Sequence, residues 1–197
     1  MTERDPRLAA FVESLRRAFD AAALEAQPRA SIDRIFAALG DVAPAGTGAP
    51  ARREVCRHLP AALAPLADAP APLARLARDF AALEPRLAWK PRPAGGPFAS
   101  ENWAEGHANA MVIGPGGLEE RGDMMIGASL LGPQVRYPDH DHGPEEIYLV
   151  LSPGRFRHGE SDWFEPGIGG TLFNVPNIRH AMASGDAPLL ALWCLRV

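Results

Sequence analysis

The chain has 197 residues, of which 47% are hydrophobic, so it holds enough apolar material for one large domain or for a small domain with an appendage. Its net charge of −4 and its scattered basic residues argue against nucleic acid or an anionic membrane as partner. The opening segment is charged and helical in pattern, unlike a signal peptide, and no run reaches the ~20 apolar residues of a membrane span.

Two cysteines, Cys56 and Cys194, lie among apolar residues far apart in the sequence. Two cysteines do not make a disulfide framework, so we expect both to be buried free thiols. Free thiols suit a reducing compartment. Together with the opening segment, they predict a cytoplasmic protein.

Residues 1–95 are predicted to form a helical region, because Ala, Leu and Arg are frequent and β-branched residues are rare. In the first helix, Leu8, Phe11, Leu15 and Phe19 recur at the spacing of one helical face. Further helices are expected over 31–39, with Ser31 as the N-cap, over 52–66 and over 72–83, with a loop at 40–50. These helices either cap the rest of the fold or form the interface of a homodimer.

A run of Pro and Gly at 90–97 breaks the chain, and residues 96–197 then show short apolar runs between Gly, Pro and Asp turns. Strands are expected over 124–131, 145–151, 170–175 and 188–196. Short strands with frequent turns are typical of a sandwich or barrel. The predicted fold is therefore mainly β, with the helical region packed on a C-terminal barrel.

A cluster of metal-ligating residue types lies around the start of the strand expected over 145–151. His140 and His142 share one face of an extended chain, as do Glu146 and Tyr148 on the next strand. A Gly-Pro pair between them can bend the chain, and His180 would return from another strand to complete the set. Three imidazoles and one carboxylate suit a divalent transition metal, and open positions on it indicate catalysis. The remaining histidines lack partners at ligand spacing and are expected to be structural or exposed: His58, His107 and His158.

This pattern resembles the two sequence motifs of the cupin superfamily, whose barrel is a double-stranded β-helix. The first motif is matched by Gly132, His140, His142, Glu146 and Gly154, with two extra residues between the first glycine and the histidine. The second is matched by Gly170, Pro176 and His180, but Ile178 and Ser184 replace its usual Gly and Asn. By spacing alone, His180 is the weakest of the four predicted ligands.

Residues 137–195 are more closely similar to the cupin-type dimethylsulfoniopropionate (DMSP) lyases, in particular those of the DddQ kind. The resemblance implies cleavage of DMSP to dimethyl sulfide and acrylate with one Zn, Fe or Mn ion. It places the metal ligands on His142, Glu146 and His180, with His140 beside them. It also places a catalytic tyrosine on Tyr148 and a second active-site tyrosine on Tyr137. The chain has only two tyrosines, and both flank the His-x-His pair.

The implied reaction is a β-elimination on a small sulfonium carboxylate. Tyr148, as a phenolate, would remove the proton next to the carboxylate, and an open metal position would bind that carboxylate. A sulfonium has no hydrogen-bond donor, so aromatic faces would hold it. The aromatic candidates for this role are Trp103, Trp163, Phe164 and Tyr137, whereas Trp193 is expected in the core.

Two other functions fit the same residues. One is another cupin metalloenzyme, either a lyase-like relative with a different substrate or an iron-dependent oxygenase. The other is a non-catalytic cupin that binds a small ligand, which would need neither Tyr148 nor an open metal position. Oxygen uptake would identify the oxygenase, and stabilisation by a ligand without turnover would identify the binding protein.

Overall fold

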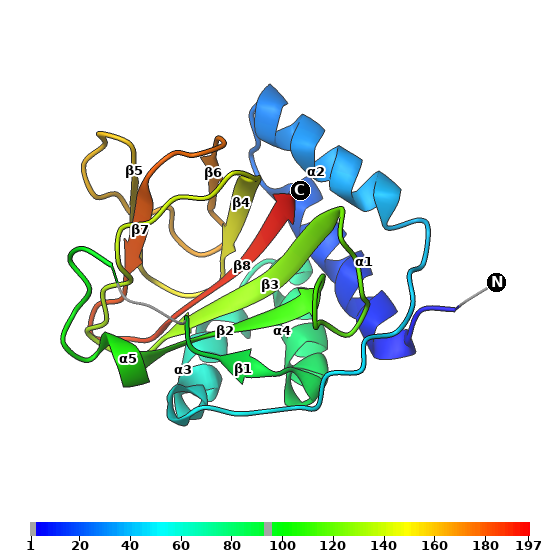
Figure 1. Ribbon diagram of the computed structural model, residues 1–197, viewed down its shortest axis with the longest axis horizontal. Helices are drawn as coiled ribbons and strands as arrows, with labels where there is room; N and C mark the ends of the chain where they lie inside the picture. The colour runs from blue at the N-terminus through cyan, green and yellow to red at the C-terminus, as the bar shows by residue number, and fades with distance from the viewer. Residues whose placement is uncertain (1–2, 93–95) are drawn as a thin grey trace.

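An antiparallel sheet of six strands forms the centre of the fold, in the order β1-β2-β3-β8-β4-β6 (Figure 1). A second sheet pairs β5 with β7. The structure is a computed structural model that describes residues 3–92 and 96–197. The strands are β1 (Trp89–Lys90), β2 (His107–Ile113), β3 (Met124–Leu131), β4 (Glu145–Val150), β5 (Arg155–His158), β6 (Thr171–Asn174), β7 (His180–Ala183) and β8 (Leu189–Arg196).

The four predicted strands are confirmed within one or two residues at each end, as β3, β4, β6 and β8. Strands β2, β5 and β7 were not predicted. They contain His, Asn, Arg and Ala in place of a continuous apolar run, so their sequences carry no strong strand signal. Pairing with neighbouring strands, which is a tertiary effect, decides their conformation.

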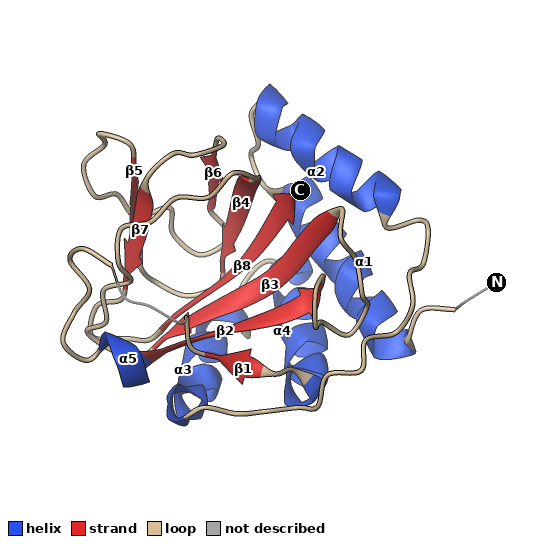
Figure 2. Ribbon diagram, viewed as in Figure 1, coloured by secondary structure: helices blue, strands red, loops and turns tan. Residues whose placement is uncertain are grey.

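Most helices lie on one side of the large sheet (Figure 2). They are α1 (Pro6–Ala21), α2 (Ala26–Ala38), α3 (Leu59–Leu63), α4 (Ala71–Leu83) and α5 (Trp103–Gly106), with short 3-10 helices at Glu54–His58, Ala64–Leu66 and Glu84–Arg86. The helix predicted over 52–66 is wrong, since this segment forms three short pieces. Pro60 and Pro65 lack the N–H groups that a continuous helix needs.

Ser31 is not the N-cap that its residue type suggested. Helix α2 begins earlier, at Ala26, and Pro28 lies in its first turn, where a proline is tolerated. Ser31 therefore lies inside the helix, and its hydroxyl donates a 2.6 Å hydrogen bond to Glu145 at the start of β4. The bond joins the helical layer to the sheet.

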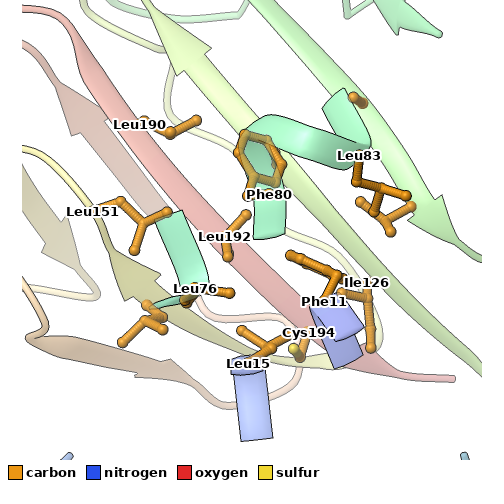
Figure 3. Packing of buried hydrophobic residues seen from close by; sticks show 14 of the residues in the cluster. Phe11, Leu15, Leu76, Phe80, Leu83, Ile126, Leu151, Leu190, Leu192 and Cys194 are labelled. Atoms are coloured by element: carbon orange, nitrogen blue, oxygen red, sulfur yellow. The ribbon is translucent and has the colours of Figure 1, made fainter. Parts of the chain in front are cut away.

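Strand β8 is buried on both faces because its side chains alternate between two cores. Leu190, Leu192 and Cys194 face the helices, where they pack with Phe11 and Leu15 of α1 and with Leu76 and Phe80 of α4 (Figure 3). The alternate residues of β8 face the interior of the barrel and belong to a second cluster: Leu189, Ala191, Trp193 and Leu195. Strand β4 alternates in the same way, so Ile147 faces the helices and Tyr148 the interior.

The structure thus confirms a mainly β, cupin-like barrel with a helical region packed on it. The helices cover the large sheet, which agrees with the first of the two alternatives, that they cap the rest of the fold. Cys56 and Cys194 are buried free thiols, as predicted. No helix in the described part of the chain is long and apolar enough to cross a membrane.

The division into regions 1–95 and 96–197 stays a prediction. Strand β1 belongs to the large sheet although it precedes residue 95. Part of the predicted break at 90–97 lies outside the described residues.

Gly127 of β3 makes room for the indole of Trp193, its partner in the β3–β8 register. A Cβ atom on Gly127 would lie 2.2 Å from the indole ring and 2.6 Å from the carbonyl oxygen of Ala110. We expect Gly127→Ala to displace Trp193 and to lower the free energy of unfolding by about 1–3 kcal/mol, which urea denaturation would measure. Gly122→Ala is the control, because no described atom lies within 4 Å of its added Cβ. Equal stability of the two variants would contradict the prediction.

Candidate metal centre and active site

Three histidine rings meet inside the barrel, as the sequence predicted. One ring nitrogen from each of His140, His142 and His180 lies within 4.8 Å of the other two. His140 and His180 exchange two backbone hydrogen bonds, of 3.1 and 2.8 Å, which bring these distant segments together. Asn177, with φ at +62°, forms the turn before His180 and donates its N–H to the carbonyl of His142. The backbone therefore positions all three rings.

The backbone also determines the tautomer of each ring. The Nδ1 atoms of His140, His142 and His180 each lie 2.9 Å from a carbonyl oxygen, of Pro138, Pro144 and Ile178 respectively. Because a carbonyl only accepts, each Nδ1 carries a hydrogen, and in the neutral ring Nε2 keeps its lone pair. Nε2 of His180 is buried and has no hydrogen-bond partner among the described residues.

Glu146 lies against two of these rings. Its Oε2 is 3.2 Å from Nε2 of His142 and 3.2 Å from Nε2 of His180. The side-chain amide of Asn174, which is fully buried, donates a 3.1 Å hydrogen bond to the same oxygen. The sequence analysis did not single out Asn174. The feature that could have indicated its role is an amide side chain at the end of β6, the strand that pairs with β4.

The charges of this cluster are strongly coupled. Burial would raise the pKa of Glu146, but the adjacent rings of His142 and His180 outweigh it and hold the pKa at about 2. Burial and then the charge of His180 lower the pKa of His140 to about 3. Burial also opposes the charged form of His142, but the Glu146 carboxylate outweighs it and raises that pKa. The cluster thus combines an ionised carboxylate with His140, whose ring is neutral at neutral pH, and His142, whose ring is more readily protonated.

These residues fit a metal ion. Nε2 of His180, which is buried without a partner, the Nε2 atoms of the two other rings and the ionised carboxylate together form an N₃O donor set of the kind that divalent transition metals take. Second hydrogen bonds that orient each ligand are typical of such sites. The assignment of His140, His142, Glu146 and His180 as the ligands stays a prediction.

A cavity of about 270 Å³ opens beside this cluster. Both tyrosines, Tyr137 and Tyr148, lie in its wall, as does Trp193, which the sequence analysis had assigned to the core. Trp193 does belong to the buried core cluster inside the barrel, as predicted, and the alternation of β8 also brings it into the cavity wall. The complete lining is Arg92, Asn109, Met125, Ser129, Tyr137, His140, Asp141, His142, Glu146, Tyr148, Trp193 and Leu195.

A chain of hydrogen bonds crosses the floor of this cavity. Nε1 of Trp193 donates to the Ser129 hydroxyl at 3.1 Å, which donates to Oδ1 of Asn109 at 2.8 Å. Nδ2 of Asn109 donates to the hydroxyl oxygen of Tyr137 at 3.0 Å. The hydrogen of the Tyr137 hydroxyl is therefore free to face the cavity. Asn109 and Ser129 were missed, although polar residues inside apolar strands are a signal for such a network.

The other predicted aromatic residues lie outside the cavity lining. Trp103 stacks on His107 at 4.1 Å between ring centres and meets the ring of Tyr137 edge-on at 6.1 Å. Trp163 faces three arginine side chains, Arg136, Arg155 and Arg157, at 5.3–5.8 Å. A sulfonium-binding role for Trp103 or Trp163 stays a prediction, whereas the aromatic side chains of the cavity itself are Tyr137, Tyr148 and Trp193.

None of the three other histidines belongs to the metal-ligating group. His107 is buried, and its Nε2 accepts a hydrogen bond from the Arg92 N–H at 2.9 Å. His158 lies 3.2 Å from Oδ1 of Asn174. His58 lies beside Gly132 at the surface.

Metal binding should release protons, because a histidine ligand must be neutral. The raised pKa of His142 keeps part of the metal-free protein protonated at a pH where an ordinary histidine is mostly neutral. We expect affinity for Zn²⁺ to fall between about pH 8 and pH 6, with proton release visible in calorimetric titrations in buffers of different ionisation enthalpy. His142→Asn should bind more weakly and release fewer protons. Identical proton release by the two proteins would exclude His142 as a ligand.

Comparison with known proteins agrees with this geometry. Residues 27–191 match the family model of the dimethylsulfoniopropionate lyases. One similar structure comes from work on the DMSP lyases RdDddP and RnDddQII, with a TM-score of 0.74 and 22% identity over 97% of this chain and 92% of that one. Another is the DMSP lyase DddQ from Ruegeria pomeroyi DSS-3, with a TM-score of 0.71 and 19% identity over 98% and 93% of the two chains.

No curated protein matches the sequence. At these identities the two structures show a shared fold, whereas the family match covers most of the chain and shows the family. The protein therefore belongs to the dimethylsulfoniopropionate lyase family, whose members are carbon–sulfur lyases that cleave DMSP.

Proposed function

We propose that this protein cleaves DMSP by β-elimination to dimethyl sulfide and acrylate, with Tyr148 as the base. The observation that carries the proposal is the position of Tyr148. Its side chain lies in the cavity wall two residues from Glu146 on the inner face of β4, beside the three histidines. A proton acceptor and a metal-ligating cluster therefore meet in one cavity.

The step requires one base and one leaving group. The base takes a proton from the carbon next to the carboxylate, and the electrons of that C–H bond form the C=C bond of acrylate. The bond between the β carbon and sulfur breaks, and dimethyl sulfide leaves with the electron pair. The proton remains on the phenol of Tyr148 until solvent removes it.

His140, His142, Glu146 and His180 would hold one divalent transition metal ion, of which zinc, iron and manganese are the candidates. When bound, such a cation supplies positive charge that favours the phenolate and stabilises the charge that develops on the substrate carboxylate. Without that charge, burial and then the Glu146 carboxylate raise the pKa of Tyr148 well above its usual value. Loss of the metal should therefore remove both the phenolate form of Tyr148 and the positive charge that stabilises the substrate carboxylate.

The apolar wall of the cavity suits the sulfonium. Trp193 and Tyr148 are cross-strand partners on β8 and β4, and Met125 and Leu195 extend the apolar wall. Aromatic faces attract a cation that cannot donate hydrogen bonds. The exposed carboxylate of Asp141 lies in the same lining and would attract the cation toward the cavity.

The alternatives from the sequence are not favoured. Family membership supports a lyase over an iron-dependent oxygenase or a non-catalytic binding protein. A relative that prefers a different small sulfonium carboxylate would use the same residues. Relative kcat/KM values for DMSP and its homologues would identify the preferred substrate.

Headspace gas chromatography of the purified protein with DMSP tests the proposed reaction directly. We expect dimethyl sulfide and acrylate in equal amounts, with turnover abolished by a chelator and restored by a divalent metal. A folded, metal-loaded protein that releases no dimethyl sulfide would overturn the proposal. Oxygen uptake would then be measured next.

Tyr148→Phe tests the base. We expect it to keep the bound metal and to lose at least about 100-fold in kcat, as is typical when a general base is removed. Tyr137→Phe is the matched comparison, because it removes the other hydroxyl of the same cavity and should cost less. Turnover retained in Tyr148→Phe but lost in Tyr137→Phe would assign the base to Tyr137.

We also propose a cytoplasmic location, because both cysteines are buried free thiols that suit a reducing compartment. A homodimer is proposed as well. Sedimentation velocity of the purified protein would test it, and a single species with the mass of one chain would contradict it.

A further inference from the structure

Arg92 brings a positive charge, which forms no ion pair with the described residues, to the edge of the catalytic cavity. Among the described residues that line this cavity, it is the only Arg or Lys. Arg92 follows β1 in the chain, and its backbone N–H donates a 2.9 Å hydrogen bond to Nε2 of His107. The guanidinium carbon lies 5.8 Å from the centre of the Tyr137 ring, so the charged group lies beside this ring in the cavity wall.

Part of the guanidinium lacks a hydrogen-bond partner among the described residues. Nη1 of Arg92 is buried and has no hydrogen-bond partner among the described residues. None of the ion pairs among the described residues includes Arg92. The following buried or half-buried carboxylates form ion pairs with other arginines: Glu84, Glu119, Glu145 and Asp139. A buried N–H without a partner costs free energy, so such a group indicates a bound anion.

The substrate supplies an anion of the right kind. A guanidinium presents parallel N–H groups that match the two oxygens of a carboxylate. We propose that Arg92 binds the carboxylate of the zwitterionic substrate and so determines the direction in which the substrate enters the cavity. This inference rests on the proposed function, because it assigns a contact to the substrate of that reaction.

The same charge would repel the other end of the zwitterion. The sulfonium would therefore lie away from Arg92, against Trp193 and Met125. Strand β1 leads to Arg92, and β2 and β3 separate it from β8, which carries Trp193. Tyr148 is the direct cross-strand partner of Trp193, so a sulfonium held against the indole places the carbon to be deprotonated beside Tyr148. The reversed orientation would place a cation against the guanidinium and is disfavoured.

Arg92 thus acts as a specificity determinant toward compounds that carry both charges. An analogue with the same cationic end but an uncharged amide in place of the carboxylate should bind poorly, because it would leave Arg92 buried without an anion. Replacement of Arg92 should remove this preference without disturbing the metal ligands, none of which it contacts by a hydrogen bond or ion pair among the described residues.

The test is a binding titration with unreactive probes on the metal-loaded and metal-free protein. The probes are 3-(trimethylammonio)propionate, in which nitrogen replaces the sulfur, and its primary amide, which has no negative charge. We expect the wild-type protein to prefer the carboxylate by roughly tenfold or more, as for a charge-assisted hydrogen bond. In the metal-free protein, where no metal attracts the carboxylate, Arg92→Gln should bring the ratio of the two affinities close to one, and Arg92→Lys should restore part of the preference.

Kinetics on DMSP provide the second readout. Arg92→Gln should raise KM by about tenfold or more while metal content and circular dichroism stay unchanged. Arg155→Gln is the matched control, because Arg155 faces Trp163 outside the cavity. It should leave the ratio and the KM as in the wild type.

The outcomes separate this proposal from the lyase function. A wild-type protein that prefers the carboxylate probe but releases no dimethyl sulfide would overturn the proposed function and support the role of Arg92. An active lyase whose Arg92→Gln variant keeps the full preference would overturn the role of Arg92 alone. Equal affinity of the wild type for both probes would also overturn it.

Discussion

The two central strands β4 and β8 are buried on both faces, and the rest of the molecule depends on this double burial. One set of side chains from each strand packs with the helices, and the alternate set lines the barrel. The helical layer therefore covers the outer face of the strands that carry Tyr148 and Trp193. Because the period of a strand is two, a shift of one residue in either strand would turn its site residues toward the helices. The apolar packing of α1 and α4 thus keeps the active-site residues in register.

The inner face contains polar groups that no isolated strand could stabilise. Glu146 keeps its charge in a fully buried position because Asn174 and two histidines surround it. The chain from Trp193 through Ser129 and Asn109 to Tyr137 satisfies the polar atoms on the opposite wall. Such networks are stable only when each member has a partner. Two of the four buried polar atoms without a partner among the described residues are Nε2 of His180 and Nη1 of Arg92, for which we propose a metal ion and a carboxylate as partners.

The charges of the cavity match those of a zwitterion. The histidine–glutamate cluster and Arg92 lie where we propose that the carboxylate binds, and an apolar aromatic wall lies where we propose that the sulfonium binds. Family membership establishes a lyase that acts on DMSP. The geometry adds an account of how this chain could orient that substrate in one cavity of about 270 Å³ beside the histidine cluster.

The sequence by itself determined the mainly β fold with its helical region, four of the strands, the free cysteines and the family. These features depend on local periodicity and on motifs within short segments, such as His140, His142 and Glu146, so neighbouring residues carry the signal. Tertiary structure alone decided the conformations of β2, β5 and β7, the place of Ser31 inside α2, and the inward direction of Trp193. It also brought Arg92, Asn109, Ser129 and Asn174 to the site. Each of these residues acquires its role from a partner far away in the chain, and strand pairing and burial, which bring such partners together, leave no mark in a short stretch of sequence.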